Sequence, residues 1–517
     1  MHDTSWVQAE QGGQKSKWTL SLLRDNARPP SRKIRPVRKQ ASFFALSLSI
    51  SGPGVQNPFM SKHPSAARRI AHNVSFLTLG RIATALCSFA YIAFAVRALG
   101  LGQFGLLILI HSLGIMASTF SRMQSWQTLI RFGNEPYARR DLDLLRQILG
   151  FCIRLDLLSA VVAVSIGVIS VALYSHIAQW TPWVTSLAYG YALISPFMYT
   201  GWSNGVLRLT DRFHLVPISD TATAIFRTTG TALGFALHLN LGFFVLVWAG
   251  AVLLDYGLFL FFALTTLRRK IGLRLHWRDV LTQWRWQLPG MWAFTRSTSI
   301  NQTLGAVSGH ISTLVVGSLL GSAEAAVFRI CRQIADGIVT PAQMLSPVLY
   351  PELVKMRDRQ DWRGLKRLTW KIFAMLCGVS VALLLVSAFF GGRIFALMLH
   401  IHLHGTTYYI SIMLVSAVLT LLIVPLEPLL TVMGQIGFLM ANRTWITLAY
   451  FPVLYGLTAT WSLKGACYAT VFSSFIMFVT RLWRAIICSL RPAKDAPRAP
   501  AVEQTGAPPE SELPAEA

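Results

Sequence analysis

Residues 240–267 read NLGFFVLVWAGAVLLDYGLFLFFALTTL, an apolar stretch with a single charged residue, Asp255. About 20 apolar residues in a helix are enough to span the ~30 Å hydrocarbon core of a bilayer. Similar stretches recur along the chain, and together they predict twelve membrane-spanning helices. They lie at 74–96, 104–130, 148–174, 183–207, 216–238, 240–267, 288–319, 325–350, 372–392, 408–433, 444–460 and 465–487.

The composition points the same way. Of the 517 residues, 53% are hydrophobic and 13% are charged, whereas soluble proteins average about 25% charged residues. We therefore predict an all-α polytopic membrane protein. Six cysteines lie in apolar stretches without a C-x-x-C pattern. The group His400, His402 and His404 has no cysteine or carboxylate near it in sequence, so we expect neither a metal site nor a cofactor.

The basic residues are distributed asymmetrically between loops. Lys and Arg total 47 and Asp and Glu total 22, which gives a net charge of +25. The termini and the alternate loops on one side of the twelve spans hold 37 of the 47 basic residues, and the opposite loops hold only Arg97, Arg393 and Lys464. Because basic loops stay in the cytoplasm, we predict that both termini are cytoplasmic. The charge is spread over short loops, which argues against a nucleic-acid partner.

The chain divides into two similar halves. Residues 96–105 (VRALGLGQFG) and 317–326 (GSLLGSAEAA) both contain Leu-Gly, then two residues, Gln or Glu, one residue, and Gly or Ala. We expect lobes of six helices at 73–267 and 288–490, joined by a basic cytoplasmic connector at 268–287. Two pseudo-symmetric lobes are a common transporter plan. The match of residues 100–105 to G-x-G-x-x-G follows a span instead of a strand, so it indicates a helix turn and not a nucleotide site.

Both ends of the chain have a different composition. Residues 1–72 are basic and are expected to be a disordered cytoplasmic extension, with Met60 as a possible true start. Residues 491–517 are rich in Pro, Ala and Glu, which predicts a disordered tail.

The ionisable residues inside the spans carry the functional information, because each costs about 2.5–3.5 kcal/mol at mid-bilayer. Arg329, Arg332 and Asp336 share one helix face by spacing, as do Asp220 and Arg227. Such stripes turned inward would line a cationic cleft for an anionic ligand, since guanidinium groups match phosphate oxygens. The alternative is that Arg332, Asp336 and similar pairs only neutralise each other. The candidate substrate-binding residues are Arg81, Arg122, Arg154, Arg227, Arg296, Arg329 and Arg332.

Glu427 lies between Pro425 and Pro428, which interrupt a span and free backbone carbonyl groups. A carboxyl group there is either a proton or cation site or a partner for the freed backbone. The candidate ion-coupling residues are Asp220, Asp336 and Glu427.

Several stretches resemble one known family. Residues 96–105, 127–133 (QTLIRFG) and 315–353 are similar to the polysaccharide biosynthesis, O-antigen-type flippases of the MOP exporter superfamily, and the resemblance covers about residues 65–490. It implies a V-shaped bundle in the bacterial cytoplasmic (inner) membrane that moves an undecaprenyl-pyrophosphate-linked oligosaccharide by alternating access. An arginine-lined lumen, a proton or sodium gradient as driving force, and a polysaccharide polymerase and chain-length regulator as partners are further implications.

This chain departs from that pattern at one position. Many relatives carry an acidic residue late in the seventh helix, where this chain has Ser312 and Thr313, so a coupling role shifts to Asp336 or Glu427. Two alternatives stay open: a multidrug or other solute exporter of the same fold, and a membrane enzyme such as a glycan polymerase. We expect no enzyme, because no span or loop offers a convincing catalytic set.

Overall fold

The computed structural model describes residues 66–212, 214–275, 288–306, 308–343, 345–399 and 406–490. Within these ranges every regular element is a helix and none is a strand, which confirms the predicted all-α class. The expected extension up to residue 65, connector residues 276–287, the histidines at 400–404 and the tail from 491 lie outside the described residues.

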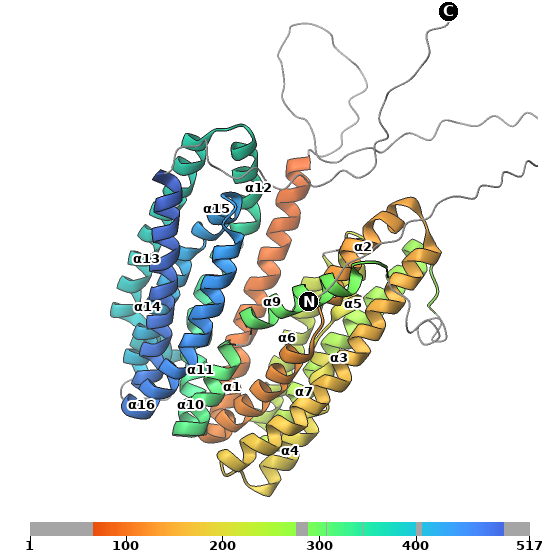
Figure 1. Ribbon diagram of the computed structural model, residues 1–517. Helices are drawn as coiled ribbons and strands as arrows, with labels where there is room; N and C mark the ends of the chain where they lie inside the picture. The colour runs from red at the N-terminus through yellow and green to blue at the C-terminus, as the bar shows by residue number, and fades with distance from the viewer. Residues whose placement is uncertain are drawn as a thin grey trace, which may run out of the picture. The chain divides into compact units, whose positions relative to one another are not determined.

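The helices of the two halves follow one another along the chain (Figure 1). The first half contains α1 (Ala66–Ser121), α2 (Ser125–Arg139), α3 (Leu142–Ile177), α4 (Pro182–Ala192), η1 (Ser195–Met198), α5 (Gly201–Leu209), α6 (Leu215–Ala236), α7 (Leu241–Thr266) and η2 (Leu267–Ile271). The second half contains α9 (Met291–Ala306), α10 (Ser308–Leu320), α11 (Ser322–Gln343), α12 (Leu345–Asp358), α13 (Trp362–Leu399), α14 (Thr406–Ile423), α15 (Leu426–Val432) and α16 (Ile436–Leu490).

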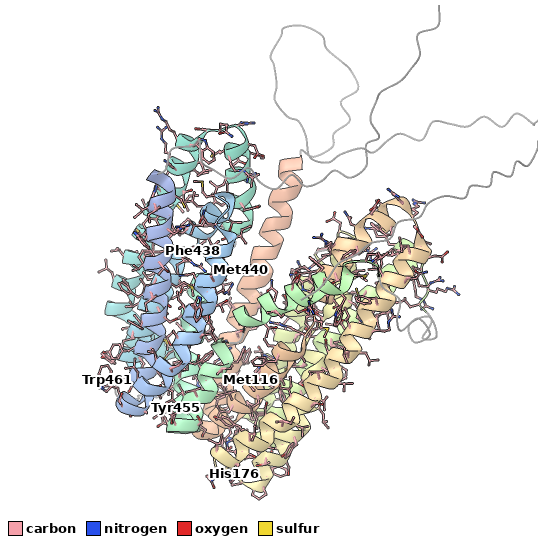
Figure 2. The ribbon with its side chains drawn as sticks, in the orientation of Figure 1. Met116, His176, Phe438, Met440, Tyr455 and Trp461 are labelled. Atoms are coloured by element: carbon pink, nitrogen blue, oxygen red, sulfur yellow. The ribbon has the colours of Figure 1, made fainter. Side chains whose placement is uncertain are left out.

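The twelve predicted stretches lie largely on helices, but not all of them are single helices. Stretch 104–130 is interrupted at residues 122–124, between α1 and α2, and stretch 183–207 is divided among α4, η1 and α5. α1 begins at Ala66, inside the expected extension, and runs through two predicted spans with a break at Gly100 (φ 70°, ψ 171°). That backbone conformation favours glycine. α16 likewise covers the last two predicted spans, with non-helical backbone at Trp461 and Ser462. Two exposed aromatic rings, Tyr455 and Trp461, lie near this break (Figure 2), as is typical of a turn at the membrane surface.

Six described helical stretches are long and apolar enough to cross a membrane. They are 83–139, 142–177, 241–271, 362–385, 408–432 and 436–488. The helices with the two polar stripes, α6 and α11, are not among them. Both pack against α1. A helix with a charged stripe is accommodated in a membrane protein when that stripe faces other helices or a cavity.

The apolar cores show how the halves are held together. One cluster combines side chains of both halves, including Leu107, Trp248 and Phe328. A second cluster belongs to the first half together with Met291 of α9, and a third, which includes Leu365, belongs to the second half. The halves therefore share a core in one region and have cores of their own elsewhere.

A close backbone contact joins the halves at Gly105 of α1. A Cβ atom built on Gly105 would lie 1.8 Å from the carbonyl oxygen of Ser322, the first residue of α11. Only glycine fits this approach. The glycines at 100 and 105 are thus explained by a bend and a helix contact, in agreement with the expected helix turn.

Candidate functional site

A polar cavity of about 780 Å³ lies among α1, α6 and α7; we call it the Arg227 cavity. Its wall includes three residues predicted from the sequence, namely Arg122, Asp220 and Arg227. Thr340 of α11 also lines it, so both halves contribute to the wall. Other polar lining residues are Thr84, Ser88, Tyr91, His111, Ser118, Thr119, Arg208, Thr223 and Asp255.

Arg227 is held by aromatic rings. Its Cζ atom lies 5.3 Å from the ring centroid of Tyr91 and 5.4 Å from that of Trp248, and the two rings meet edge to face at 5.4 Å. Its Nε is buried and has no hydrogen-bond partner among the described residues. Cation–π contacts orient a guanidinium group without neutralising its charge. Arg227 thus presents its positive charge at the cavity wall, where Asp255 is near enough to interact with it electrostatically.

The two carboxyl groups of this cavity differ in their surroundings. Asp255 of α7 accepts hydrogen bonds from the hydroxyl groups of Ser219 (3.0 Å) and Thr223 (3.4 Å) of α6. Asp220 lines the same wall and is exposed. Arg208 of α5 donates from Nε to the side-chain oxygen of Asn204 (2.7 Å) and stacks over Trp126 at 4.6 Å. The cavity thus combines cationic, acidic and hydroxyl groups.

Two histidines lie near arginines of both halves. His111 of α1 is close enough to interact electrostatically with Arg227 and Arg329. His310 of α10 interacts in the same way with Arg122, Arg329 and Arg332. Nδ1 of His111 is 2.7 Å from the Tyr191 hydroxyl oxygen. Four of the seven predicted arginines, namely Arg122, Arg227, Arg329 and Arg332, thus lie within electrostatic range of these two histidines, and Asp336 lies 3.9 Å from Arg332. We call these four arginines the cationic cluster.

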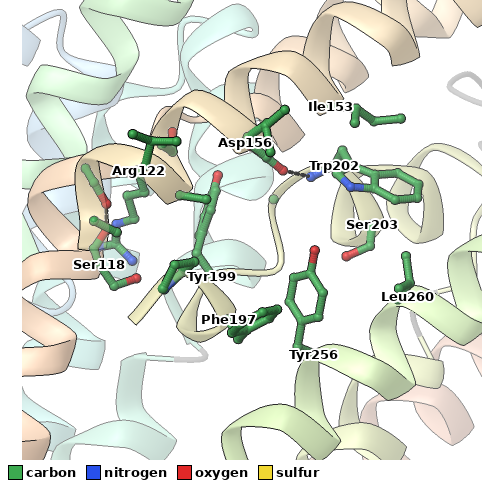
Figure 3. A pocket seen from close by; sticks show the side chains of 18 of the residues that line it. Ser118, Arg122, Ile153, Asp156, Phe197, Tyr199, Trp202, Ser203, Tyr256 and Leu260 are labelled. Carbon is green, nitrogen blue, oxygen red and sulfur yellow. Dashed lines mark hydrogen bonds between the residues drawn. The ribbon is translucent and has the colours of Figure 1, made fainter. Parts of the chain in front are cut away.

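A second cavity, of about 1070 Å³, lies among α3, η1, α5 and α7; we call it the Asp156 cavity (Figure 3). One carboxylate oxygen of Asp156, Oδ2, accepts a hydrogen bond from the backbone N–H of Trp202 (2.8 Å). The other, Oδ1, is buried without a partner among the described residues. Ser118, Arg122 and Phe197 line both cavities, so Arg122 lies where the two cavities adjoin.

Two of the predicted acidic residues pair with arginines, and two of the predicted arginines line neither cavity. Arg332 Nε lies 3.9 Å from Asp336 Oδ2, and the Asp336 side chain is 64% exposed. Glu427 of α15 forms an ion pair with Arg481 of α16 (3.3 Å). Arg154 is buried on α3 and lines neither cavity, and Arg296 is exposed on α9.

Arg81 lies on α1, and its side chain is outside the described part of the chain. The roles predicted for all these residues stay predictions.

Sequence reasoning left several residues at or near these cavities out of the candidate site. His111 and His310 were not counted among the intramembrane charges, although both lie inside predicted spans. Asp156 and Asp255 stood out as charged residues in apolar stretches, and that signal could have identified them. The rings of Tyr91 and Trp248 gave no signal, because aromatic residues are common throughout the spans.

No protein-family model matches the chain. It is 26% identical over 321 residues to the inner membrane protein YghQ of Escherichia coli (strain K12), which covers 62% of this chain and 89% of that protein. A multidrug resistance MATE family transporter of the MOP superfamily in an inward-facing conformation superposes with a TM-score of 0.61 at 14% identity, covering 79% of this chain and 98% of the other. The lipid II flippase MurJ in an inward closed conformation gives a TM-score of 0.60 at 12% identity, covering 81% of this chain and 89% of the other.

The two structural likenesses are of nearly equal strength, and at such low identity they establish the architecture only. The described residues form a polytopic helical bundle, and the chain has the fold of the MOP superfamily of transporters.

Proposed function

We propose that this protein is a flippase that translocates a lipid-linked oligosaccharide across the bacterial cytoplasmic membrane by ion-coupled alternating access. The observation that carries this proposal is the cationic cluster of Arg122, Arg227, Arg329 and Arg332 around two histidines. A pyrophosphate group is a dense anion, and guanidinium groups bind its oxygens with short, charge-assisted hydrogen bonds. The undecaprenyl pyrophosphate substrate rests on the family resemblance.

The arrangement suits a substrate that is held and then released. Arg227 belongs to the first half, whereas Arg329 and Arg332 belong to the second. A movement of one half relative to the other would separate these charges and weaken their joint hold on a phosphate. The rings of Tyr91 and Trp248 keep Arg227 in place while the ligand exchanges.

Ion coupling is assigned in this proposal to acidic residues next to the arginines. Asp220 lines the Arg227 cavity, and Asp336 is 3.9 Å from Arg332. Binding of a proton or a sodium ion at either carboxyl group would change the local charge that an anionic ligand experiences. Glu427 is the third candidate, and its ion pair with Arg481 would have to open for it to take part.

One observation favours export of a cationic solute or drug as a second candidate function. Asp220 and Asp255 line the same cavity as Arg227, and carboxylates with aromatic walls are suited to organic cations. The fold likeness does not separate the two candidates, because a multidrug transporter and a lipid flippase match almost equally well.

The test is a transport assay on the full-length protein in proteoliposomes. The probe is a fluorescent polyprenyl-diphosphate-linked disaccharide, and translocation is followed with a quencher that does not cross the membrane. Uptake of a cationic dye is measured in parallel. We expect lipid translocation that slows at least tenfold in Arg227→Gln and is partly kept in Arg227→Lys, because lysine retains the charge but loses the planar guanidinium group.

Arg139→Gln is the matched control, since Arg139 forms an exposed ion pair with Glu135 (2.6 Å) on α2. This variant should transport at the normal rate. Dye uptake without lipid translocation would replace the flippase proposal with the exporter. Equal lipid translocation by the normal protein and by Arg227→Gln would remove the cationic cluster from the mechanism.

A further inference from the structure

The Asp156 cavity has a long apolar wall. Leu157 and Val161 of α3 line it together with Leu260 and Leu264 of α7. The side chains of Leu157 and Val161 are 50% and 61% exposed. α3 and α7 are both long and apolar enough to cross a membrane, and exposed apolar side chains on such helices favour contact with hydrocarbon. This side of the cavity is therefore accessible to hydrocarbon chains.

The opposite, inner side of the cavity carries an uncompensated charge. Arg122 follows the last residue of α1, and its Nε is buried without a hydrogen-bond partner among the described residues. Tyr199 lies between Arg122 and Asp156 (Figure 3), and its hydroxyl group donates a hydrogen bond to the Met123 carbonyl oxygen (3.0 Å). Arg122 and Asp156 form no ion pair in the described part of the chain, and Asp156 is instead bound to the Trp202 backbone N–H. Arg122 thus offers a positive charge on the inner side of a cavity whose lining also includes Asp156, Arg268 and Arg274.

The two cavities adjoin at this charge. Ser118, Arg122 and Phe197 belong to the walls of both. An amphiphile whose phosphate contacts Arg122 would place its polar part in the Arg227 cavity and its apolar part in the Asp156 cavity. A volume of about 1070 Å³ slightly exceeds the range of about 300–1,000 Å³ for small-molecule sites, which suits a segment of a long chain.

We propose that the Asp156 cavity binds the apolar chain of a polyprenyl phosphate lipid, with Arg122 contacting the phosphate group nearest to that chain. This assignment rests on the proposed flippase function and adds the place where the lipid part of the substrate is held. Burial of methylene groups against Leu157, Val161 and Leu260 supplies the affinity. The unpaired guanidinium group selects a phosphorylated lipid over a neutral one.

The experiment measures binding of undecaprenyl phosphate to the full-length protein in detergent by native mass spectrometry. Ala160 lines the cavity, and Ala172, on the same helix, does not. We expect Ala160→Phe to weaken binding at least tenfold by filling the cavity, and Ala172→Phe to bind normally. Arg122→Gln should weaken binding of undecaprenyl phosphate at least tenfold and leave binding of the neutral alcohol undecaprenol unchanged.

A second variant tests the same wall in case Ala160→Phe does not fold. Val161→Trp obstructs the same wall at a side chain that is already 61% exposed, and it should weaken binding in the same way. Normal binding by both variants would overturn the proposal. An equal loss of phosphatidylglycerol binding would also overturn it, because the cavity would then be a general lipid site.

The outcomes also separate this inference from the proposed function. If the protein translocates the lipid-linked sugar and both wall variants bind and transport normally, the cavity assignment fails and the flippase proposal stands. If the protein translocates nothing while undecaprenyl phosphate binding responds to the wall variants, the binding site stands and the flippase proposal fails.

Discussion

Arg227 in the first half and Arg481 in the second are both arginines of an apolar bundle, yet their surroundings differ. Arg481 is 3% exposed and forms an ion pair with Glu427 across two helices. Arg227 lies between two aromatic rings at the wall of a cavity and has no carboxylate within ion-pair distance among the described residues. The charge of Arg481 is buried and paired with a carboxylate, whereas the charge of Arg227 is partly exposed at a cavity wall.

The difference separates two uses of a buried charge. Taking a charge out of water costs several kcal/mol, and an ion pair compensates for part of that cost. A charge that is paired in this way is not available to a ligand. Cation–π contacts contribute about 0.5–2 kcal/mol and leave the guanidinium N–H groups free to bind an anion. Arg481, buried and paired with Glu427, is thus a structural element, and Arg227, held by rings beside a cavity, is a binding element.

The largest effect is expected for an arginine of the cationic cluster. Arg332→Ala should lower lipid translocation by more than about 30-fold, because loss of a charged contact to a buried ligand costs about 2 kcal/mol or more. Its melting temperature should stay nearly unchanged, since the pair with the exposed Asp336 contributes little. Transport and thermal unfolding in detergent are measured together. Full transport by Arg332→Ala would show that Arg332, like Arg481, has a structural role only.

The contact between the two halves should give the next largest effect. Gly105→Ala would force apart α1 and the start of α11, and we expect a loss of about 1–3 kcal/mol of stability, as for other overpacked sites. Gly102→Ala is the matched control, because nothing lies within 4 Å of its added Cβ. Thermal unfolding of both variants measures the difference in stability. Equal melting temperatures would mean that the helices tolerate a wider separation.

The two partners of the ion pair in the second half should not be equivalent. Glu427→Gln leaves the buried Arg481 without its counter-charge and should cost about 1–2 kcal/mol of stability. Arg481→Met removes the buried charge, and the half-exposed Glu427 turns to solvent, so the cost should be below about 1 kcal/mol. The two melting temperatures provide the comparison. A larger loss in Arg481→Met would assign the stability to the arginine's own packing.

The smallest effect is expected at the surface. Arg139 and Glu135 form an ion pair one helical turn apart, with side chains that are 75% and 71% exposed. Arg139→Ala should change stability by less than about 0.5 kcal/mol. A clear drop in melting temperature would indicate that α2 depends on surface charges, in contrast to the rest of the bundle.

Local features of the sequence predicted much of the fold. The predicted spans lie largely on helices, and the breaks near Gly100 and Pro425 occur where glycine and proline indicated them. The pairing of Arg332 with Asp336 follows from helix geometry, because residues four apart share a face. The exposure of Arg296 was harder to predict, because the order of residues along α9 does not show which face of the helix packs against other helices.

The sequence by itself determined the helical class, the number of apolar stretches and the polar stripes on α6 and α11, because these depend on hydrophobicity and on spacing along a helix. Only the tertiary structure decided which arginines are neutralised and which line a cavity. Glu427 and Arg481 are far apart in sequence, as are Tyr91, Arg227 and Trp248. Contacts of this kind arise from the packing of whole helices, and no local pattern of residues specifies them.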